Sequence, residues 1–75
     1  MRIQTRYGVI ETPKYTVYKG QRYTFMKAKK TMTEAKSDYN MMYSTKFKLY
    51  TIRTPIITGK NKGKGMYAMY LSWKK

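Results

Sequence analysis

Residues 31–44, TMTEAKSDYNMMYS, carry the one helical spacing of apolar residues in this 75-residue chain. Five side chains fall on one face at that spacing: Met32, Ala35, Tyr39, Met42 and Tyr43. Thr31 and Glu34 fit a capping box, in which the hydroxyl and the carboxylate each accept a hydrogen bond from a free backbone N–H group. Glu34 also places a negative charge near the positive end of the helix dipole. We therefore predict a helix over residues 32–44.

The sequence on both sides of this helix alternates with a period of two, which is typical of strands. The predicted strands span residues 2–10, 14–18, 22–27, 46–53 and 66–73. A Lys19-Gly20-Gln21 turn joins the second and third strands into a hairpin. Pro13 ends the first strand, and Pro55 ends the fourth or lies at a sheet edge, because proline cannot donate a ladder hydrogen bond.

These elements predict a single α+β domain over residues 1–75, in which a small antiparallel sheet of about five strands carries one helix on one face. Three strands precede the helix and two follow it. The other face of the sheet is then partly open or covered by another copy of the chain. A homodimer is one way for so small a chain to bury more surface. A small, tightly curved barrel is the alternative architecture.

The charge balance is the strongest signal in the composition. Lys and Arg number 17 and Asp and Glu number three, which gives a net charge of +14. Such an excess destabilises a compact fold through self-repulsion, so a polyanionic partner is its simplest explanation. Nucleic acid is the polyanion that a strongly basic small domain usually binds.

The residue types needed for most enzyme chemistry are missing. The chain has no His and no Cys, so neither a Ser-His-Asp nor a Cys-His centre can form, and a zinc site is not expected. Glu11, Glu34 and Asp38 are the only carboxylate side chains, which are too few for a two-metal nuclease. Nothing distinguishes one of the nine tyrosines as a nucleophile. We expect no catalytic residue, no metal and no cofactor.

Residues 58–65, TGKNKGKG, invite comparison with a phosphate-binding loop, but their spacing differs from the Walker A motif. The residue five after Gly59 is Lys64, and Gly63 with Lys64 is followed by Gly65 rather than Ser or Thr. The segment is typical of a hairpin tip. It is either a plain solvated turn or a basic tip whose lysines contact phosphates, and the two interpretations are compatible.

Cations on the strands and loops are candidate phosphate contacts, which position a nucleic acid without reading its sequence. Tyr18, Tyr50 and Tyr70 fall on strand faces opposite those assigned to the core, which makes them candidates for stacking on bases. The other interpretation is that tyrosines fill the core in place of scarce aliphatic residues. The predicted contacts are Arg2, Arg6, Arg22, Lys27, Lys29, Lys30, Lys46, Lys48, Tyr50, Arg53, Lys60, Lys62, Lys64 and Tyr70.

Residues 8–35, GVIETPKYTVYKGQRYTFMKAKKTMTEA, place strands around a Lys-Gly turn and then begin a helix at T-x-x-E-A. This order resembles small DNA-binding modules in which a sheet precedes a helix, such as the arm-binding domains of tyrosine recombinases. The basic final segment, residues 46–75, has no counterpart in that pattern.

The sequence thus predicts a small, non-enzymatic protein that binds DNA or RNA mainly through phosphates. The alternative is a protein-interaction module, such as a virus-encoded regulator or inhibitor that docks on an acidic protein or a nucleoprotein complex. No signal peptide and no apolar run of membrane-spanning length is evident. We expect no membrane partner and a cytoplasmic protein associated with nucleic acid or the nucleoid.

Overall fold

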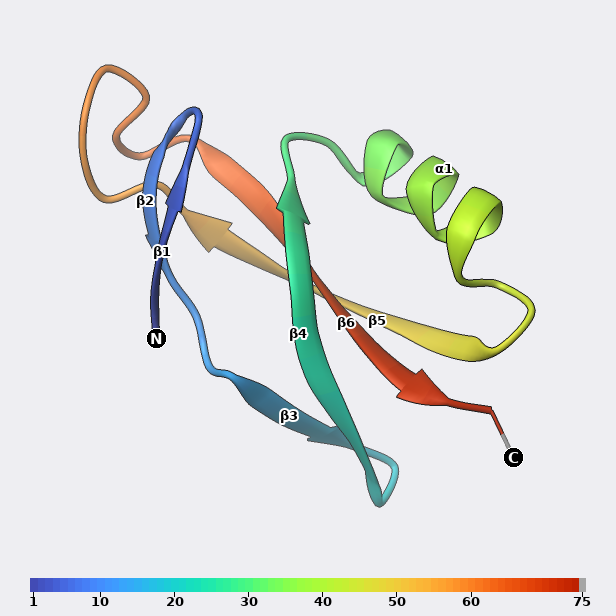
Figure 1. Cartoon of the computed structure of the whole chain (residues 1–75). Helices are drawn as coiled ribbons and strands as arrows, with labels where there is room; N and C mark the ends of the chain where they lie inside the picture. Colours follow the sequence, from blue (N-terminus) through green and yellow to red (C-terminus); the bar gives the residue numbers. More distant parts are fainter. Residues whose placement is uncertain (75) are drawn as a thin grey trace.

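The computed structural model describes residues 1–74, which form six strands in two antiparallel sheets and one helix (Figure 1). The elements are β1 (Arg2–Thr5), β2 (Gly8–Glu11), β3 (Tyr15–Tyr18), β4 (Gln21–Lys29), α1 (Met32–Met42), β5 (Phe47–Pro55) and β6 (Gly65–Trp73). β1 and β2 pair with each other, and the larger sheet has the order β3-β4-β6-β5. The predicted α+β architecture is confirmed, and the larger sheet has the curvature of the barrel alternative.

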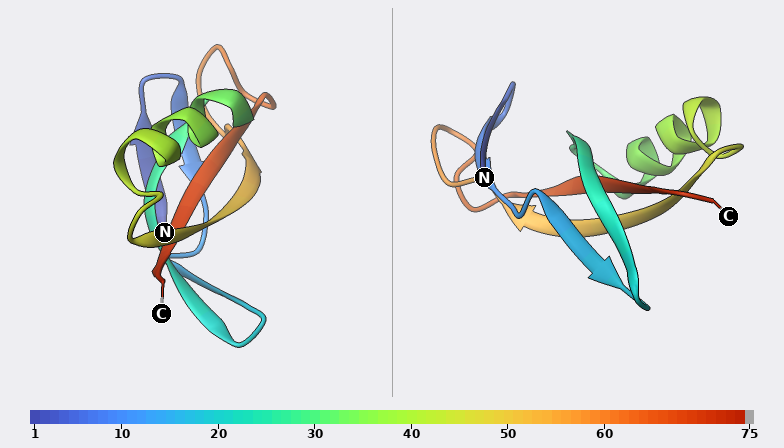
Figure 2. Two further views of the ribbon diagram at one scale, coloured as in Figure 1. Left: turned by 90° about the vertical axis from the view of Figure 1, so that its right-hand side faces the viewer. Right: turned by 60° about the horizontal axis from the view of Figure 1, so that its bottom comes forward.

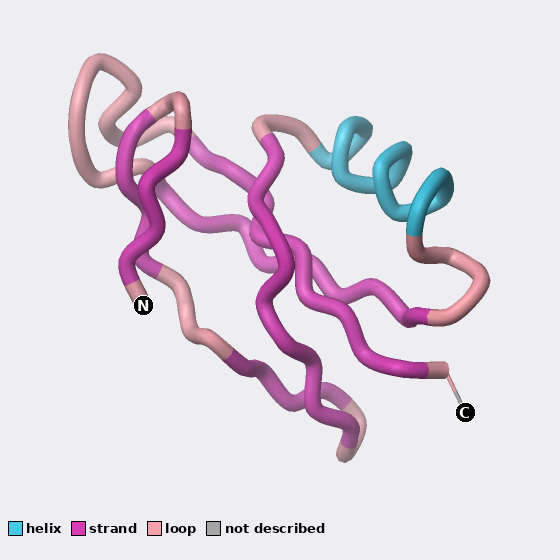
Figure 3. The backbone as a smooth tube through the Cα atoms, in the orientation of Figure 1, coloured by secondary structure: helices cyan, strands magenta, loops and turns pink. Residues whose placement is uncertain are grey.

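The helix begins where the capping signal predicts. The Thr31 hydroxyl accepts a hydrogen bond from the Glu34 backbone N–H at 3.1 Å, and the last helical residue is Met42. α1 packs on one face of the larger sheet, against β4 and β6 (Figure 3). Ala35 is fully buried in this contact, and the Tyr39 hydroxyl donates to the Phe47 carbonyl at the start of β5.

The predicted single strand over residues 2–10 is wrong, because the chain reverses at Arg6 and Tyr7 to form the β1–β2 hairpin. Gly8 permits this reversal with a φ of 130°, a value that side chains disfavour. A Cβ atom on Gly8 would also lie 2.6 Å from the Ile56 side chain. The hairpin pairs Ile3 with Ile10, which is fully buried.

The larger sheet curls strongly. Adjacent strands lie about 4.8 Å apart, so the edge strands β3 and β5 of a flat four-stranded sheet would be about 14 Å apart. Instead the rings of Tyr18 on β3 and Tyr50 on β5 have centroids only 5.1 Å apart. A shift of register between Phe25 and Lys27 marks a bulge, which bends β4 locally. Figure 2 shows the resulting curvature from two sides.

The concave face of this sheet, on the side away from α1, holds an aromatic core. Tyr23, Ala68 and Tyr70 are buried there, and partly buried Phe25, Tyr50 and Ile52 pack around them. The β1–β2 hairpin closes one end of the same face through Ile10, Ile56 and Met66. The face that we expected to be open or covered by another copy is therefore filled by the chain itself.

Tyr70 is part of this core, so its prediction as a base-stacking residue is wrong. Its ring has no exposed surface, and its hydroxyl donates to the Pro13 carbonyl. Because a phenol has one proton, the Thr12 hydroxyl donates to the Tyr70 oxygen over 2.6 Å. The physical reason is the central position of β6: α1 covers one of its faces, and the curled sheet and the hairpin cover the other.

Replacing Tyr70 by Phe should lower the free energy of unfolding by about 1–3 kcal/mol at pH 7, because the buried Thr12 hydroxyl and the Pro13 carbonyl lose their partner. Burial raises the pKa of Tyr70 above 10.0. Its neutral form thus stabilises the fold fully below pH 10, and this stabilisation is lost as the pH rises through the higher folded pKa. In urea unfolding, the difference in unfolding free energy between the wild type and Tyr70→Phe should become smaller above pH 10. An equal loss from the exposed control Tyr18→Phe would contradict this assignment.

Candidate nucleic-acid interface

Few of the cations have an acidic partner. The Arg2 Nε lies 3.1 Å from the Glu11 Oε2, and the Lys27 Nζ lies 2.9 Å from the Asp38 Oδ2. Residues 1–74 contain 16 Lys and Arg side chains, so 14 of them have no side-chain carboxylate partner within that part of the chain. The positive charge of this protein is therefore displayed on its surface rather than neutralised internally.

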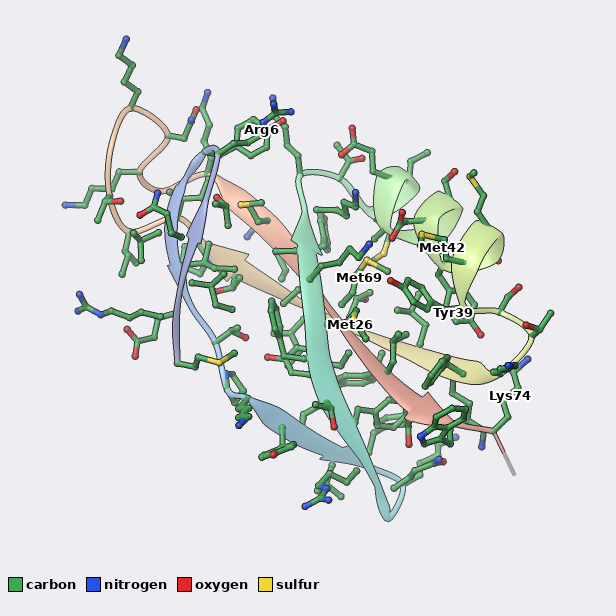
Figure 4. All side chains as sticks on the ribbon, viewed as in Figure 1. Arg6, Met26, Tyr39, Met42, Met69 and Lys74 are labelled. Carbon is green, nitrogen blue, oxygen red and sulfur yellow. The ribbon has the colours of Figure 1, made fainter. Side chains whose placement is uncertain are left out.

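Seven of the predicted contacts come together at one end of the molecule, which we call the loop end (Figure 1). They are Arg6, Lys29, Lys30, Arg53, Lys60, Lys62 and Lys64. They come from the β1–β2 turn, the end of β4, the end of β5 and the loop before β6. Arg6 is labelled in Figure 4 above the helix start, while Lys74 lies at the opposite end.

Hydrogen bonds fix the β5–β6 loop against the β1–β2 hairpin. The Asn61 side chain donates to the Tyr7 carbonyl at 3.2 Å, and the Thr58 hydroxyl accepts from the Val9 N–H at 3.0 Å. The Lys30 Nζ lies 5.1 Å from the centre of the Tyr7 ring, which is a cation–π distance. These contacts join the lysines of the loop to those that precede α1.

A row of three side chains crosses the sheet at the loop end. Tyr67 on β6 pairs with Lys29 on β4 and with Arg53 on β5, so a half-buried aromatic ring lies between two cations. The Arg53 guanidinium lies over Gly65, where a Cβ atom would be 2.6 Å from its Cζ. This row is on the same face of the sheet as α1 and next to its first turn, because the Thr51 hydroxyl one row away contacts the Met32 sulfur.

The TGKNKGKG stretch forms the connection between β5 and β6, as predicted for a hairpin tip. The Ile56 N–H donates to the Lys64 carbonyl at 2.8 Å, and the Gly63 N–H donates to the Ile56 carbonyl at 2.8 Å. Gly63 has a φ of 89°, which suits a residue without a side chain. Lys60, Lys62 and Lys64 are exposed on this tip.

The remaining predicted contacts do not join the loop end. Arg22, Lys46 and Lys48 lie at the opposite end, around the β3–β4 turn and the start of β5. Tyr50 is half-buried between Tyr18 and Tyr23, so its ring packs within the protein. Arg2 and Lys27 are engaged with carboxylates, and Tyr70 is in the core.

Two aromatic residues at the surface were missed by the sequence analysis. Trp73 leaves 64% of its surface exposed and Tyr15 leaves 45%, and neither residue is among the predicted contacts. The Arg22 guanidinium lies 4.9 Å from the Tyr15 ring centre. The adjacent basic residues Lys14 and Lys74 were the one local signal of exposure, since charged neighbours mark an end of a strand that a core does not cover.

Neither a metal-binding cluster nor a membrane-spanning helix is found within residues 1–74. That part of the chain contains no group of three or more His, Cys, Asp or Glu side chains that could hold a metal ion. Its helix, α1, lacks the length and apolar character needed to cross a membrane.

Comparison of the chain with models of known protein families, with curated proteins and with solved structures gives no match. The function is therefore inferred from the residues and their arrangement.

The Lys27–Asp38 pair should contribute to stability rather than to binding. The Asp38 side chain is only 20% exposed, and its hydrogen bond to Lys27 lowers the pKa of the carboxyl below 3.8. The ionised pair thus stabilises the fold above the unfolded-state pKa, and this contribution is lost as the pH falls through the lower folded pKa. Asp38→Asn should cost about 1 kcal/mol at pH 7 and nothing well below pH 3 in thermal or urea unfolding. Glu11→Gln, in the exposed pair with Arg2, is the matched control and should lower the free energy of unfolding by less. A larger loss of unfolding free energy in Glu11→Gln than in Asp38→Asn would refute this ranking.

Proposed function

We propose that this protein is a small, non-catalytic nucleic-acid-binding protein that holds the phosphate backbone at its loop end. The observation that carries this proposal is the grouping of seven cations from four separate segments of the chain. Two carboxylates, Glu34 and Asp38, line the same groove as Arg6, Lys29 and Lys30, and Asp38 is already paired with Lys27.

The energetics support a polyanionic ligand. Like charges held together by the fold raise its free energy, and a row of phosphates would offset that repulsion. Each neutralised phosphate also releases condensed counterions, which favours binding at low salt. Because lysines on a loop contact phosphates rather than base edges, we expect limited sequence preference.

One observation favours the alternative of docking on an acidic protein. β3 pairs with residues 21–24 of β4, whereas residues 26–29 have β6 on one side and no strand of the described chain on the other. This free edge lies in a groove of about 780 Å³ between the β1–β2 hairpin and α1, with Lys29 and Lys30 on its walls. An extended acidic segment could add to such an edge as a further strand.

The proposed function is tested by replacing Lys60 and Lys62 with Gln and measuring affinity for a short duplex and a short single strand across a salt series. Affinity should fall, and the slope of log K against log salt should decrease by up to about two units, because each lost phosphate contact removes a little under one. The matched control is Lys19→Gln with Lys36→Gln, which removes the same charge from the β3–β4 turn and the outer surface of α1.

An equal change in slope in both double variants would show that only net charge matters and would overturn the assignment of the loop end. Absence of salt-dependent binding to any nucleic acid would overturn the function itself. Recovery of one acidic protein by the nuclease-treated chain would then favour the free edge of β4.

A further inference from the structure

Beyond the C-terminal end of α1, the sheet face that carries the helix exposes Tyr15, Val17 and Trp73 around the buried Leu71. We call this area the aromatic face, and it consists of Tyr15, Val17, Arg22, Thr24, Phe47, Leu71 and Trp73. The strand register places them in adjacent rows: Thr24 pairs with Tyr15 and with Leu71, Arg22 pairs with Val17, and Trp73 pairs with Phe47. A groove of about 330 Å³ crosses this face and also touches Met26.

The aromatic face holds its rings in fixed positions while leaving them open to solvent. Trp73 stacks on Phe47 with ring centroids 4.3 Å apart and an interplanar angle of 34°. Tyr43, just after α1, packs edge-on against the other side of Phe47. Trp73 nevertheless remains 64% exposed, because the helix ends before it reaches the last row of the sheet.

The rim of the aromatic face is positively charged. The Lys14 Nζ and the Arg22 guanidinium lie 5.5 Å and 4.9 Å from the Tyr15 ring centre. Lys46 and Lys74 flank Phe47 and Trp73 and are joined by a backbone hydrogen bond of 2.9 Å. No carboxylate side chain lines the groove.

We infer that the aromatic face stacks the unpaired bases of a single-stranded nucleic acid. This inference rests on the proposed function and adds to it the class of nucleic acid. An exposed indole supported by a second ring offers a flat surface to a base, and stacking of this kind does not depend on base identity. A duplex keeps its bases stacked inside the helix, so it can use the cations but not the rings.

The arrangement of the face also favours a single strand over a second copy of this chain. In a homodimer across this surface, Lys14, Arg22, Lys46 and Lys74 of one copy would face the same cations of the other, with no carboxylate of the groove between them. Tyr67 and Trp73 lie on one face of β6, six residues or about 20 Å apart, with Met69 under the helix between them. Because α1 covers the sheet between these two residues, a ligand that contacts both must pass around the helix, which a flexible single strand can do and a stiff duplex cannot.

Trp73 is the only tryptophan of the chain, so its fluorescence reports directly on the aromatic face. The experiment titrates the protein with a thymidine 12-mer and with an abasic oligonucleotide of the same length, which has the same phosphates and no bases. The 12-mer should quench Trp73 and bind at least about fivefold more tightly, because stacking contributes to affinity for each base that is held. The abasic strand should bind without quenching.

A variant then separates stacking from charge. Trp73→Ala should lower affinity for the thymidine 12-mer about fivefold or more and leave affinity for the abasic strand and a duplex unchanged, while Trp73→Phe restores part of the loss. Met42→Ala, which removes another exposed apolar side chain that lines neither groove, is the control and should change none of these affinities. Circular dichroism checks that each variant is folded, and the wild-type titration requires no variant.

Equal affinity for the two wild-type ligands without quenching would overturn the inference and leave phosphate binding at the loop end intact. Failure to bind any of the ligands would overturn both. A change of Trp73 fluorescence and hydrodynamic size with protein concentration alone would show that a second copy covers this face and would also overturn the inference.

Discussion

The burial of β6 on both faces is the constraint on which the rest of this structure depends. One face is covered by α1, and the other is enclosed because the sheet curls until Tyr18 and Tyr50 of its two edge strands touch. The hydroxyl of Tyr70 then joins the centre of β6 to Thr12 and Pro13, in the segment that links the N-terminal hairpin to β3. A chain with few aliphatic residues thus builds its core from tyrosine, and the hydroxyl finds its partners in the backbone and side chain of that segment.

The shortage of carboxylates shapes the surface as strongly as β6 shapes the interior. Glu11 and Asp38 are each paired with a cation, and Glu34 stabilises the start of the helix. Within residues 1–74, Glu34 is thus the one unpaired carboxylate side chain in a molecule whose longest dimension is 41 Å, and it lies in the groove with Arg6, Lys29 and Lys30. The two ends differ in character, since the loop end presents lysines on a turn and the other end presents rings with a basic rim. We propose that the loop end binds phosphates and that the aromatic face at the other end binds unpaired bases.

Local sequence signals were sufficient to locate the start of α1 and the β3–β4 hairpin. The capping residues Thr31 and Glu34 located the helix start, and the Lys19-Gly20 turn located the β3–β4 hairpin. Alternation failed at residues 2–10, because a two-residue turn interrupts the strand and moves the buried position to Ile10. It failed again at Tyr70, because a rule that assigns one face to the core cannot describe a strand buried on both. The sequence likewise identified the candidate cations, but it did not show which of them lie together in the fold.

The sequence by itself determined most of the elements, the absence of His and Cys, and a net charge of +14, which is the basis for proposing a polyanionic partner. These properties depend on residue type and on spacings of a few positions. The tertiary structure alone decided that Tyr70 is core and Trp73 is surface, that Lys27 is paired, and that Arg6, Lys29, Arg53 and Lys60 share one end. Those outcomes depend on the curl of the sheet and on contacts between segments up to 61 residues apart, such as Thr5 with Met66. A pattern read along the chain contains no information about such distances, because they depend on which strands pair with one another in the folded sheet.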